Sequence, residues 1–321
     1  MRPLRDHLSS VETSTRPPTK RVRGVSESHI ITLGNGRNVI FKPSPADSNV
    51  KGKWASNPAM EVIAYSLSEL LDMDLVPLTT FEVGIAVEDS ISKRIVKKEG
   101  SAQDWIDGAV PMIRLPERAI VKAPLDEKVA MGVLDYLLGN KDRHGGNILV
   151  KSSDGTLVAI DHGLANPVRA GKTYWEMARV IIGKAIPEYV VRACLSVEQD
   201  FHSRCEVIKH DYLAGDWVQF TQEGKTVWAV IRRKLYDEDQ SPVFVVASEK
   251  ADVLTPKQIT KAWRREHRTL PSGLERACFV SGANSELQAK TNTIKILAKI
   301  GVLKKYNWKI SEKFLPKEAV K

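Results

Sequence analysis

Three polar side chains suited to handling a phosphoryl group lie close together in the stretch from Gly139 to Pro167. Asp142 and Asn147 stand in the pattern D-x-x-x-x-N on a loop that contains glycine, and Asp161 follows in the pattern D-x-G. Carboxylate and amide oxygens are ligands that Mg²⁺ prefers, and a carboxylate beside an attacking hydroxyl orients it and accepts its proton. The pattern predicts magnesium-dependent phosphoryl transfer, with Asp142 at the acceptor and Asn147 and Asp161 at the metal.

A predicted β-hairpin separates the two halves of this pattern. Ile148 to Val150 is a short apolar run, residues 152–155 (SSDG) are turn formers, and Leu157 to Ile160 is a second apolar run. Because such a turn folds the chain back on itself, we expect Asp161 to return to the neighbourhood of Asn147. The alternative is an ordinary hairpin whose polar residues face solvent.

Two further polar residues lie inside the loop itself. His144 either shares the acceptor proton or stabilises transferred charge, and a structural hydrogen bond is the alternative. Arg143 is expected to hold the loop in place rather than to touch substrate. The glycines Gly145 and Gly146 are expected to let the backbone turn tightly, so that Asn147 points inward.

The segments on either side of this region must hold it in place. Leu125 to Leu138 has the apolar spacing of a helix that ends at Gly139, and we expect this helix to pack under the loop. After the hairpin, Gly163 is expected to allow a close turn behind Asp161. The His162 side chain either faces the metal site or packs against other residues away from it, and we favour packing.

Transfer from a nucleotide also needs a cation on a rigid element to hold the phosphates. Ser28 to Leu33 and Arg37 to Lys42 read as two strands joined by the turn at residues 34–36 (GNG). Lys42 ends an apolar run, where a charge is unusual unless it has a partner. The polyanion of ATP is such a partner, so Lys42 is a predicted ATP-binding residue.

Residues 57–71 predict a helix with Asn57 as its N-cap. Glu61 lies beside its apolar stripe and is the predicted partner of Lys42, which makes it part of the ATP site. The alternative for Glu61 is a first-turn acid that serves the helix dipole. Glu69 is the second candidate for the pairing with Lys42.

The residues quoted so far resemble a known family. The loop reads DRHGGN at residues 142–147, and the hairpin ends in DHG at residues 161–163. With the flanks VLDYLLGN at residues 133–140 and AIDHGLANP at residues 159–167, it resembles the phosphatidylinositol 3-/4-kinase superfamily, and most closely the type II phosphatidylinositol 4-kinase branch. The resemblance implies a two-lobed, protein-kinase-like α+β fold, with ATP and Mg²⁺ as cofactors.

The same resemblance implies further ATP-binding residues. Those near Gln103 to Ile106 would line the adenine pocket through backbone groups. Trp105 either forms a wall of that pocket or is buried in the core. Ser26 and Ser28 either donate hydrogen bonds to phosphate or cap a turn.

Composition limits the class and location of the protein. An apolar fraction of 42% in 321 residues is ample for a packed core. No apolar run approaches the roughly 18 residues of a membrane span, so no transmembrane segment is expected. The cysteines Cys194, Cys205 and Cys278 form neither a disulfide framework nor a zinc motif, which favours a reducing, cytoplasmic location.

The net charge of +9 is concentrated in the last third of the chain. Residues 203–321 contain 22 basic and 14 acidic residues, a net charge of +8. Such an excess predicts a nucleic acid or another acidic partner, and simple solubility is the alternative.

The last third also has its own pattern of elements. Residues 216–220, 226–231 and 242–246 alternate as the strands of a small β-meander. Its aromatic residues form either a core or a binding face: Trp217, Phe220, Trp228 and Phe244. Further helices are predicted at residues 174–184, 187–210, 255–267 and 286–300. The basic residues of the last two form either a nucleic-acid reader or a solvated surface.

These observations predict a basic disordered tail (1–23), an amino-terminal kinase lobe (24–103), a carboxy-terminal lobe (104–213) and an added β-meander with a helical module (214–321). The predicted function is an ATP- and Mg²⁺-dependent kinase. Type II lipid kinases carry a cysteine-rich lipidated loop after the lysine strand, and residues 43–55 contain no cysteine, so a protein hydroxyl is favoured over a lipid as acceptor. The alternatives are a lipid kinase, nucleotidyl transfer, or a nucleotide-binding regulator whose basic third binds nucleic acid.

Overall fold

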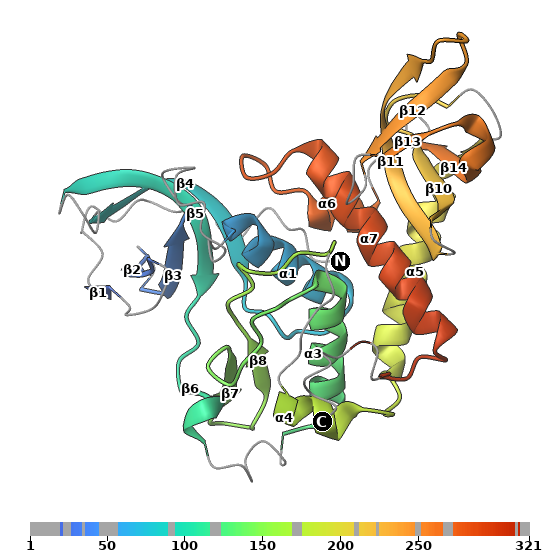
Figure 1. Cartoon of the computed structure of the whole chain (residues 1–321). Coiled ribbons are helices and arrows are strands. Elements are labelled where there is room, and N and C mark those ends of the chain that lie inside the picture. Colours follow the sequence, from blue (N-terminus) through green and yellow to red (C-terminus); the bar gives the residue numbers. More distant parts are fainter. Residues whose placement is uncertain are drawn as a thin grey trace.

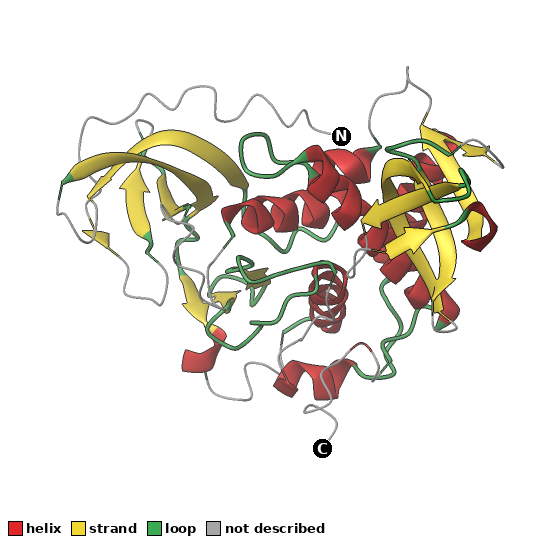
Figure 2. Cartoon of the chain, turned by 45° about the horizontal axis from the view of Figure 1, so that its top comes forward, coloured by secondary structure: helices red, strands yellow, loops and turns green. Residues whose placement is uncertain are grey.

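The chain has a mixed α+β fold, with a large β-sheet at each end and helices between them (Figure 1, Figure 2). The computed structural model describes residues 20–21, 27–33, 36–44, 57–88, 94–115, 123–168, 175–208, 212–222, 225–247, 252–265, 272–311 and 314. The α+β fold class predicted from the sequence is confirmed.

The amino-terminal sheet is antiparallel. Its strands are β1 (Lys20–Arg21), β2 (His29–Thr32), β3 (Asn38–Pro43), β4 (Thr79–Glu88) and β5 (Ile95–Asp104), in the spatial order β1-β2-β3-β5-β4. The predicted pair of strands around residues 34–36 is present as β2 and β3, although residues 34–35 lie outside the described part. Strand β1 is a correction, because residues 20–21 were assigned to a disordered tail.

Helix α1 (Pro58–Leu70) crosses from this sheet to the rest of the molecule. The side chain of Asn57 accepts a hydrogen bond from the backbone N–H of Ala59 at 3.0 Å, as predicted for the N-cap. Ile63, Ala64 and Leu67 are fully buried on the face that packs into the main core. The apolar face therefore fixes the rotation of the helix and the direction in which Glu61 points.

A second unit lies below α1 in Figure 1 and carries the predicted chemistry. It contains β6 (Ala109–Pro111), the short 3₁₀ helix η1 (Met112–Arg114), α3 (Leu125–Leu138), β7 (Ile148–Lys151) and β8 (Leu157–Ala159), with the sheet order β6-β7-β8. The helix and hairpin lie where the sequence predicted them. Gly139 ends α3 in the left-handed conformation, with φ of 60°, which glycine adopts without strain.

The predicted helix pair that follows is shorter than expected. The helices are α4 (Trp175–Ile181) and α5 (Glu188–Ser203). The second was predicted to run to residue 210, but residues 205–208 form strand β9 (Cys205–Ile208). Residues 205–208 pair with residues 262–265 and so do not continue the helix.

The predicted β-meander is part of a six-stranded antiparallel sheet. Its strands are β9, β10 (Trp217–Gln222), β11 (Lys225–Tyr236), β12 (Pro242–Ala247), β13 (Asp252–Leu254) and β14 (Ile259–Arg265), in the order β13-β12-β11-β10-β14-β9. The helix predicted at residues 255–267 is wrong: a 3₁₀ turn, η2 (Pro256–Gln258), leads directly into β14, which pairs with β10 and β9. The core interpretation is confirmed for Trp217, Phe220 and Phe244, and the side chain of Trp228 lies outside the described part.

Two helices complete the chain, α6 (Gly273–Cys278) and α7 (Glu286–Lys305). The sheet has a hydrophobic cluster of its own, whereas these helices share the main core with α1, α3 and α5. The prediction of an added module therefore fits the carboxy-terminal sheet, but not α6 and α7, which belong to the main core. Among the described helices, none is long and apolar enough to cross a bilayer.

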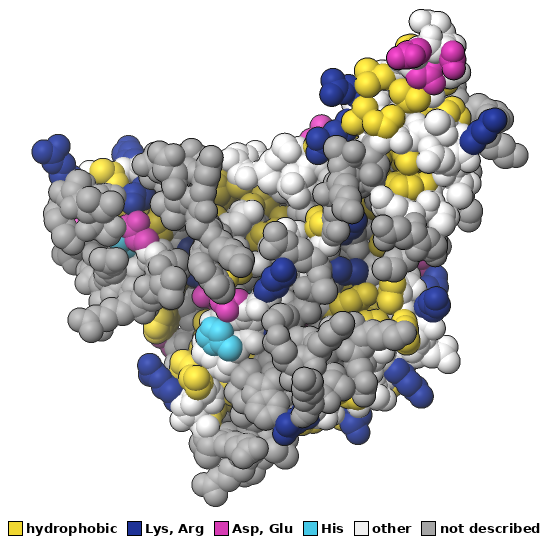
Figure 3. Space-filling model, viewed as in Figure 1, with side chains coloured by type: hydrophobic (Ala, Val, Ile, Leu, Met, Phe, Trp, Pro, Cys, Tyr) yellow, Lys and Arg dark blue, Asp and Glu magenta, His cyan; other side chains and the backbone are white. Residues whose placement is uncertain are grey.

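The predicted basic helical surface is not formed by the described residues. One of its two helices is strand β14, and α7 is packed into the core along much of its length. Lys290 pairs with Glu286 at 2.9 Å and Lys304 pairs with Glu198 at 2.7 Å. On the face shown in Figure 3, the described lysines and arginines are scattered rather than gathered over one element.

Candidate active site

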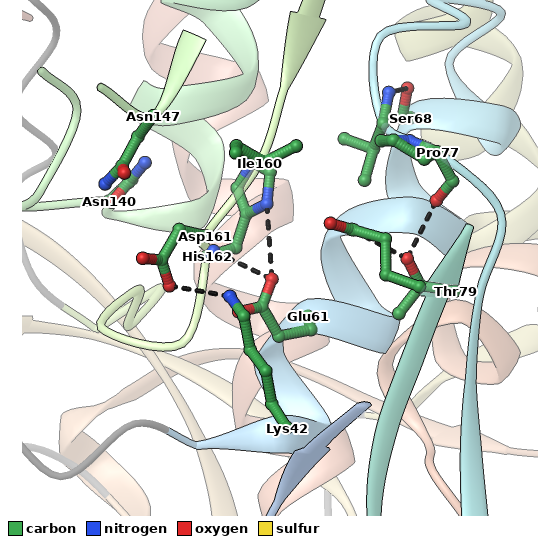
Figure 4. Close-up of polar contacts among 12 residues, drawn as sticks. Lys42, Glu61, Ser68, Pro77, Thr79, Asn140, Asn147, Ile160, Asp161 and His162 are labelled. Carbon is green, nitrogen blue, oxygen red and sulfur yellow. Dashed lines mark hydrogen bonds and ion pairs between the residues drawn. The ribbon is translucent and has the colours of Figure 1, made fainter. Parts of the chain in front are cut away.

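The first group of the site is the side chain of Lys42, which reaches from β3 toward two carboxylates (Figure 4). Its Nζ donates to Oε1 of Glu61 at 2.6 Å and to Oδ1 of Asp161 at 2.8 Å. The ion pair predicted between Lys42 and Glu61 is thus present, and Glu69, the second candidate, is exposed. Lys42 joins the amino-terminal sheet, α1 and the end of the β7–β8 hairpin at one point.

The surroundings of Lys42 and Glu61 keep both of these groups charged. Burial alone would lower the pKa of Lys42, but the carboxylates of Glu61 and Asp161 outweigh it and raise the pKa above its ordinary value. Burial would raise the pKa of Glu61, but Lys42 and His162 outweigh it and hold this pKa well below the usual range. The Glu61 side chain is 1% exposed and that of Asp161 is 39% exposed, so Asp161 is the carboxylate that a ligand can reach.

Asp161 adopts a backbone conformation that non-glycine residues rarely take. Its φ is 59°, in the left-handed region, where Asp and Asn are tolerated better than most other residues. The close turn predicted at Gly163 is present, because the N–H of Ala165 donates to the carbonyl of His162 at 2.8 Å, although the φ of Gly163 is not positive. The carbonyl of Gly163 accepts a hydrogen bond from the N–H of Asn57 at 2.8 Å, which ties this loop to the start of α1.

The catalytic-loop candidates lie across the hairpin from Asp161. The N–H of Ile160 donates to the carbonyl of Asn147 at 3.1 Å, which places Asn147 opposite the residue before Asp161. The Asn147 side-chain N–H donates to the carbonyl of Asp142 at 2.8 Å, so its amide oxygen is the atom left to meet a ligand. Asp142 and Asn147 are therefore joined to each other and brought next to Asp161.

His144 is an exposed residue of the loop. Its Nδ1 accepts a hydrogen bond from the N–H of Gly146 at 3.0 Å, so the structural hydrogen bond that the sequence left open is present. The tight turn predicted at Gly145 and Gly146 is present, because the N–H of Asn147 donates to the carbonyl of His144 at 2.8 Å, although neither glycine has a positive φ. A Cβ at Gly146 would lie 2.8 Å from the imidazole ring of His144, so a larger residue there would displace that ring.

Arg143 holds the loop through a set of contacts that the sequence did not fully predict. Its Nε donates to Oδ2 of Asp135 at 3.1 Å, and its Nη1 donates to the carbonyls of Asn147 and Ile160, the latter at 2.8 Å. Asn140 also donates to Asp135, at 2.9 Å. A signal for Asp135 was present, since it is an acid within the apolar run of α3, where a buried charge requires partners.

The predicted adenine-binding segment joins the two lobes. Gln103 lies in β5 between β3 and β4, and its side chain donates to the Thr79 hydroxyl at 2.9 Å. The backbone of Gln103 is therefore used in pairing with the neighbouring strands, so it is not available for the predicted contact with adenine. Ile106 follows the strand, and among the described residues none bonds to its backbone groups. Trp105 is 42% exposed, so its core alternative is wrong.

The predicted phosphate-binding serines are placed only in part. Ser26 lies outside the described residues, and Ser28 is buried just before β2. Their roles stay predictions. No cluster of three or more His, Cys, Asp or Glu side chains suited to a metal occurs among the described residues. Mg²⁺ is commonly held by only one or two protein oxygens together with substrate phosphates and water, and Asn147 with Asp161 fits that demand.

A buried lysine held by a helical glutamate, opposite D-x-x-x-x-N and D-x-G, is the arrangement found in protein-kinase-like phosphotransferases. Residues 86–210 match the family described as "Phosphatidylinositol 3- and 4-kinase". The chain therefore carries a phosphatidylinositol 3- and 4-kinase family domain, and the resemblance noted in the sequence is confirmed. Lys42 and Glu61 precede the matched residues, so their place in the site comes from the geometry.

Similar proteins are known from Arabidopsis thaliana. "Phosphatidylinositol 4-kinase gamma 5" is 33% identical over 100 residues, which cover 29% of this chain and 15% of that protein. "Phosphatidylinositol 4-kinase gamma 7" is 42% identical over 60 residues, which cover 16% of this chain and 9% of that protein. The matches thus span 15% or less of the length of these relatives.

Solved structures with a similar chain path share little sequence with this protein. A crystal structure of the Golgi casein kinase aligns with a TM-score of 0.38 and 15% identity, covering 60% of this chain and 65% of that chain. A structure of hydra Fam20 with sugar aligns with a TM-score of 0.31 and 12% identity, covering 51% of this chain and 70% of that chain.

Proposed function

We propose that this protein is an ATP- and Mg²⁺-dependent kinase that transfers the γ-phosphoryl group to a hydroxyl. The observation that carries the proposal is the pair of contacts from Lys42 Nζ to Glu61 at 2.6 Å and to Asp161 at 2.8 Å. A buried ammonium held between a helix and the hairpin end is suited to anchoring the phosphates of ATP. Asn147 and Asp161 would hold Mg²⁺, which neutralises phosphate charge when bound.

The residues of the loop would serve the acceptor. Asp142 orients the attacking hydroxyl and accepts its proton as the oxygen bonds to the γ-phosphorus. The bond from that phosphorus to the β–γ bridging oxygen breaks, and ADP leaves with the electron pair. The transition state is loose and needs positioning more than base strength, so an ordinary carboxylate suffices. His144, which is exposed on the same loop, would contact the acceptor or the transferred group.

The acceptor is proposed to be a protein hydroxyl, with a lipid hydroxyl as the alternative. The support is that residues 43–55 contain no cysteine, unlike the lipidated loop of type II lipid kinases. A cytoplasmic location and an acidic or nucleic-acid partner for residues 203–321 stay predictions.

The test uses Mg²⁺ and ATP labelled at either the γ- or the α-phosphate, with myelin basic protein and phosphatidylinositol vesicles offered as separate acceptors. Asp142→Ala and Asp161→Ala are compared with wild type. Asp154→Ala is the matched control, because Asp154 is an exposed acid in the turn of the same hairpin. We expect γ-label on protein or on the kinase itself, lost at least about 100-fold in the two site variants and retained in the control.

Each other result has a definite meaning. Label from the α-phosphate would replace phosphoryl transfer by nucleotidyl transfer. Label on vesicles alone would make the lipid the acceptor. Equal γ-label in wild type and both site variants would show that Asp142 and Asp161 are not part of the active site.

A further inference from the structure

A continuous set of buried polar contacts runs behind the site, from α3 to α1. It begins at Asp135, whose carboxylate receives the Arg143 guanidinium at 3.1 Å. Nη2 of Arg143 lies 2.7 Å from Nε2 of His162. The backbone N–H of His162 in turn donates to Oε2 of Glu61 at 2.9 Å. The two carboxylate oxygens of Glu61 thus face different groups, with Oε1 on Lys42 and Oε2 on His162.

The arrangement determines the protonation state of His162. An arginine donates and never accepts, so Nε2 of His162 must be the acceptor and must carry no proton. The ring proton therefore lies on Nδ1, which has no hydrogen-bond partner within bonding distance and faces Oε2 of Glu61 at 3.7 Å. With Nε2 unprotonated, the fully buried ring is neutral.

These contacts link two parts of the molecule that approach each other only through tertiary structure. Arg143 belongs to the loop that carries Asp142, and Glu61 belongs to α1, which packs between the amino-terminal sheet and the main core. His162 touches both. Its ring lies between them, with Nε2 2.7 Å from Nη2 of Arg143 and Nδ1 3.7 Å from Oε2 of Glu61.

We propose that His162 is a positioning residue, which holds Glu61 against Lys42 by bonding the Arg143 guanidinium on one side and facing the Glu61 carboxylate on the other. The proposal rests on the kinase function proposed above. In D-F-G kinases the residue at this place is a phenylalanine whose packing sets the active or inactive state. A phenylalanine cannot accept from Arg143, so this chain uses a polar contact at that place.

The size of the effect follows from burial. The Arg143 side chain is 0% exposed, so loss of the His162 acceptor leaves a buried N–H of a cation without a partner. A buried donor left without an acceptor changes an equilibrium constant by about 5- to 140-fold. If Arg143 and α1 shift so that this N–H finds another acceptor, Glu61 moves away from Lys42. Lys42 is then held less firmly in the position that binds the phosphates of ATP.

The test compares His162→Gln with His162→Asn, two amides of nearly equal polarity. The Gln amide reaches the place of Nε2 and accepts from Arg143, whereas the Asn amide stops at the place of Nδ1. Val158→Ala is the control for general destabilisation, because Val158 is buried on the same hairpin and contacts neither Arg143 nor Glu61 through a hydrogen bond. The measurements are the Kd of Mg-ATP by calorimetry, the split between kcat and KM for ATP, and hydrogen exchange of the α1 amides without nucleotide.

We expect His162→Asn to raise the Kd and the KM for ATP about 10-fold and to speed exchange in α1 but not in α3. His162→Gln is expected to stay within about 3-fold of wild type, and Val158→Ala to keep the wild-type Kd at lower stability. Equal Kd values for wild type and His162→Asn, or an equal rise in both amide variants, would overturn the proposal. If wild type binds Mg-ATP with Lys42-dependent affinity but transfers no γ-label, the proposed function fails while the positioning role is still judged by Kd and exchange.

Discussion

Lys42 and Glu61 depend on each other, because both are buried and each charge is costly to bury without its partner. Removal of one member of such a pair leaves an uncompensated charge, and Lys42→Met is expected to destabilise the fold by about 3–5 kcal/mol near neutral pH. It is also expected to abolish ATP binding. Chemical denaturation and calorimetry measure the two effects.

The pH dependence of that difference follows from the directions of the pKa shifts. The pKa of Glu61 is held below its ordinary value of 4.5, so its contribution is present above that pH and is lost as the pH falls through the lowered pKa. The pKa of Lys42 is raised above 10.5, so its contribution is present below that pH and is lost only as the pH rises above it. In wild type these two contributions should stay constant from about pH 5.5 to 9. In Lys42→Met, burial without the ammonium raises the pKa of Glu61, so the variant should fall further below wild type in stability as the pH rises and Glu61 ionises. A difference between wild type and variant that does not grow with pH would contradict the assignment.

The backbone of Asp161 leads to a separate prediction. Asn tolerates the left-handed conformation about as well as Asp, whereas a β-branched residue is strained there. Asp161→Asn and Asp161→Val are both expected to lose phosphoryl transfer, but the Val variant should be less stable than the Asn variant by a further ~1–3 kcal/mol. Thermal unfolding of the pair separates the role of the carboxylate from that of the backbone, and equal stabilities would show that φ is not constrained.

At the scale of single residues, the sequence was most informative where a local pattern showed that a charged residue needs a partner. A lysine after an apolar strand and a glutamate on an amphipathic helix were enough to predict the contact between Lys42 and Glu61. The contacts of Arg143 with His162 could not be predicted in the same way. They join a loop to the residue after a hairpin, and the spacing of neither segment shows which ring nitrogen meets which guanidinium nitrogen.

At the scale of elements, the position of β3 depends on a close approach to β5. A Cβ at Gly100 would lie 2.2 Å from the carbonyl oxygen of Lys42 and 2.7 Å from Cα of Pro43, both backbone atoms. Gly100→Ala must therefore displace β3, and we expect lower stability together with a higher KM for ATP. Gly301→Ala in α7 is the control, because nothing lies within 4 Å of its Cβ and the helix should gain about 0.5–1 kcal/mol. An unchanged KM in Gly100→Ala would show that β3 tolerates the shift.

Elements with a strong local signal were predicted well, and those formed by distant pairing were not. α1 and α3 have a capping residue and a continuous apolar face, so their sequences alone were sufficient. Residues 259–265 have a spacing compatible with a helix, but they form β14 because β10 and β9 offer a partner on each side. Strand formation depends on such context more than helix formation does.

At the scale of the whole molecule, the last helices are structural supports of the kinase-like part. Leu274 and Cys278 of α6 are buried in the same cluster as α1, and the N–H of Gly273 donates to Asp200 of α5 at 2.8 Å. Phe201 of α5 packs against Trp217 of the carboxy-terminal sheet, with ring centroids 5.1 Å apart. The position of α1, and with it the Lys42–Glu61 contact, therefore depends on residues some two hundred positions later in the chain. The sequence could not show this, because the packing partners of a helix are not encoded in its own periodicity.

The clearest link of this kind is Lys299 of α7, which meets the end of α3 just before the catalytic loop. Its Nζ donates to the carbonyls of Tyr136 and Leu137 at 2.8 and 3.3 Å and lies 5.4 Å from the centre of the Tyr136 ring. Burial, together with the nearby charge of Lys295, lowers the pKa of Lys299 to about 7. Burial raises the pKa of Tyr136 to about 12, so Tyr136 does not titrate between about pH 7 and 10.

Between about pH 7 and 10 the unfolded chain binds a proton at Lys299 that the folded chain does not, so stability must rise with pH across this window. Wild type should therefore gain stability relative to Lys299→Met as the pH increases from about 7 to 10, by up to about 1.4 kcal/mol for each pH unit. Lys305→Met, which removes an exposed lysine from the same helix, should show no such trend. Denaturant titrations at several pH values measure the difference, and parallel curves for the two variants would mean that Lys299 stays charged against the end of α3.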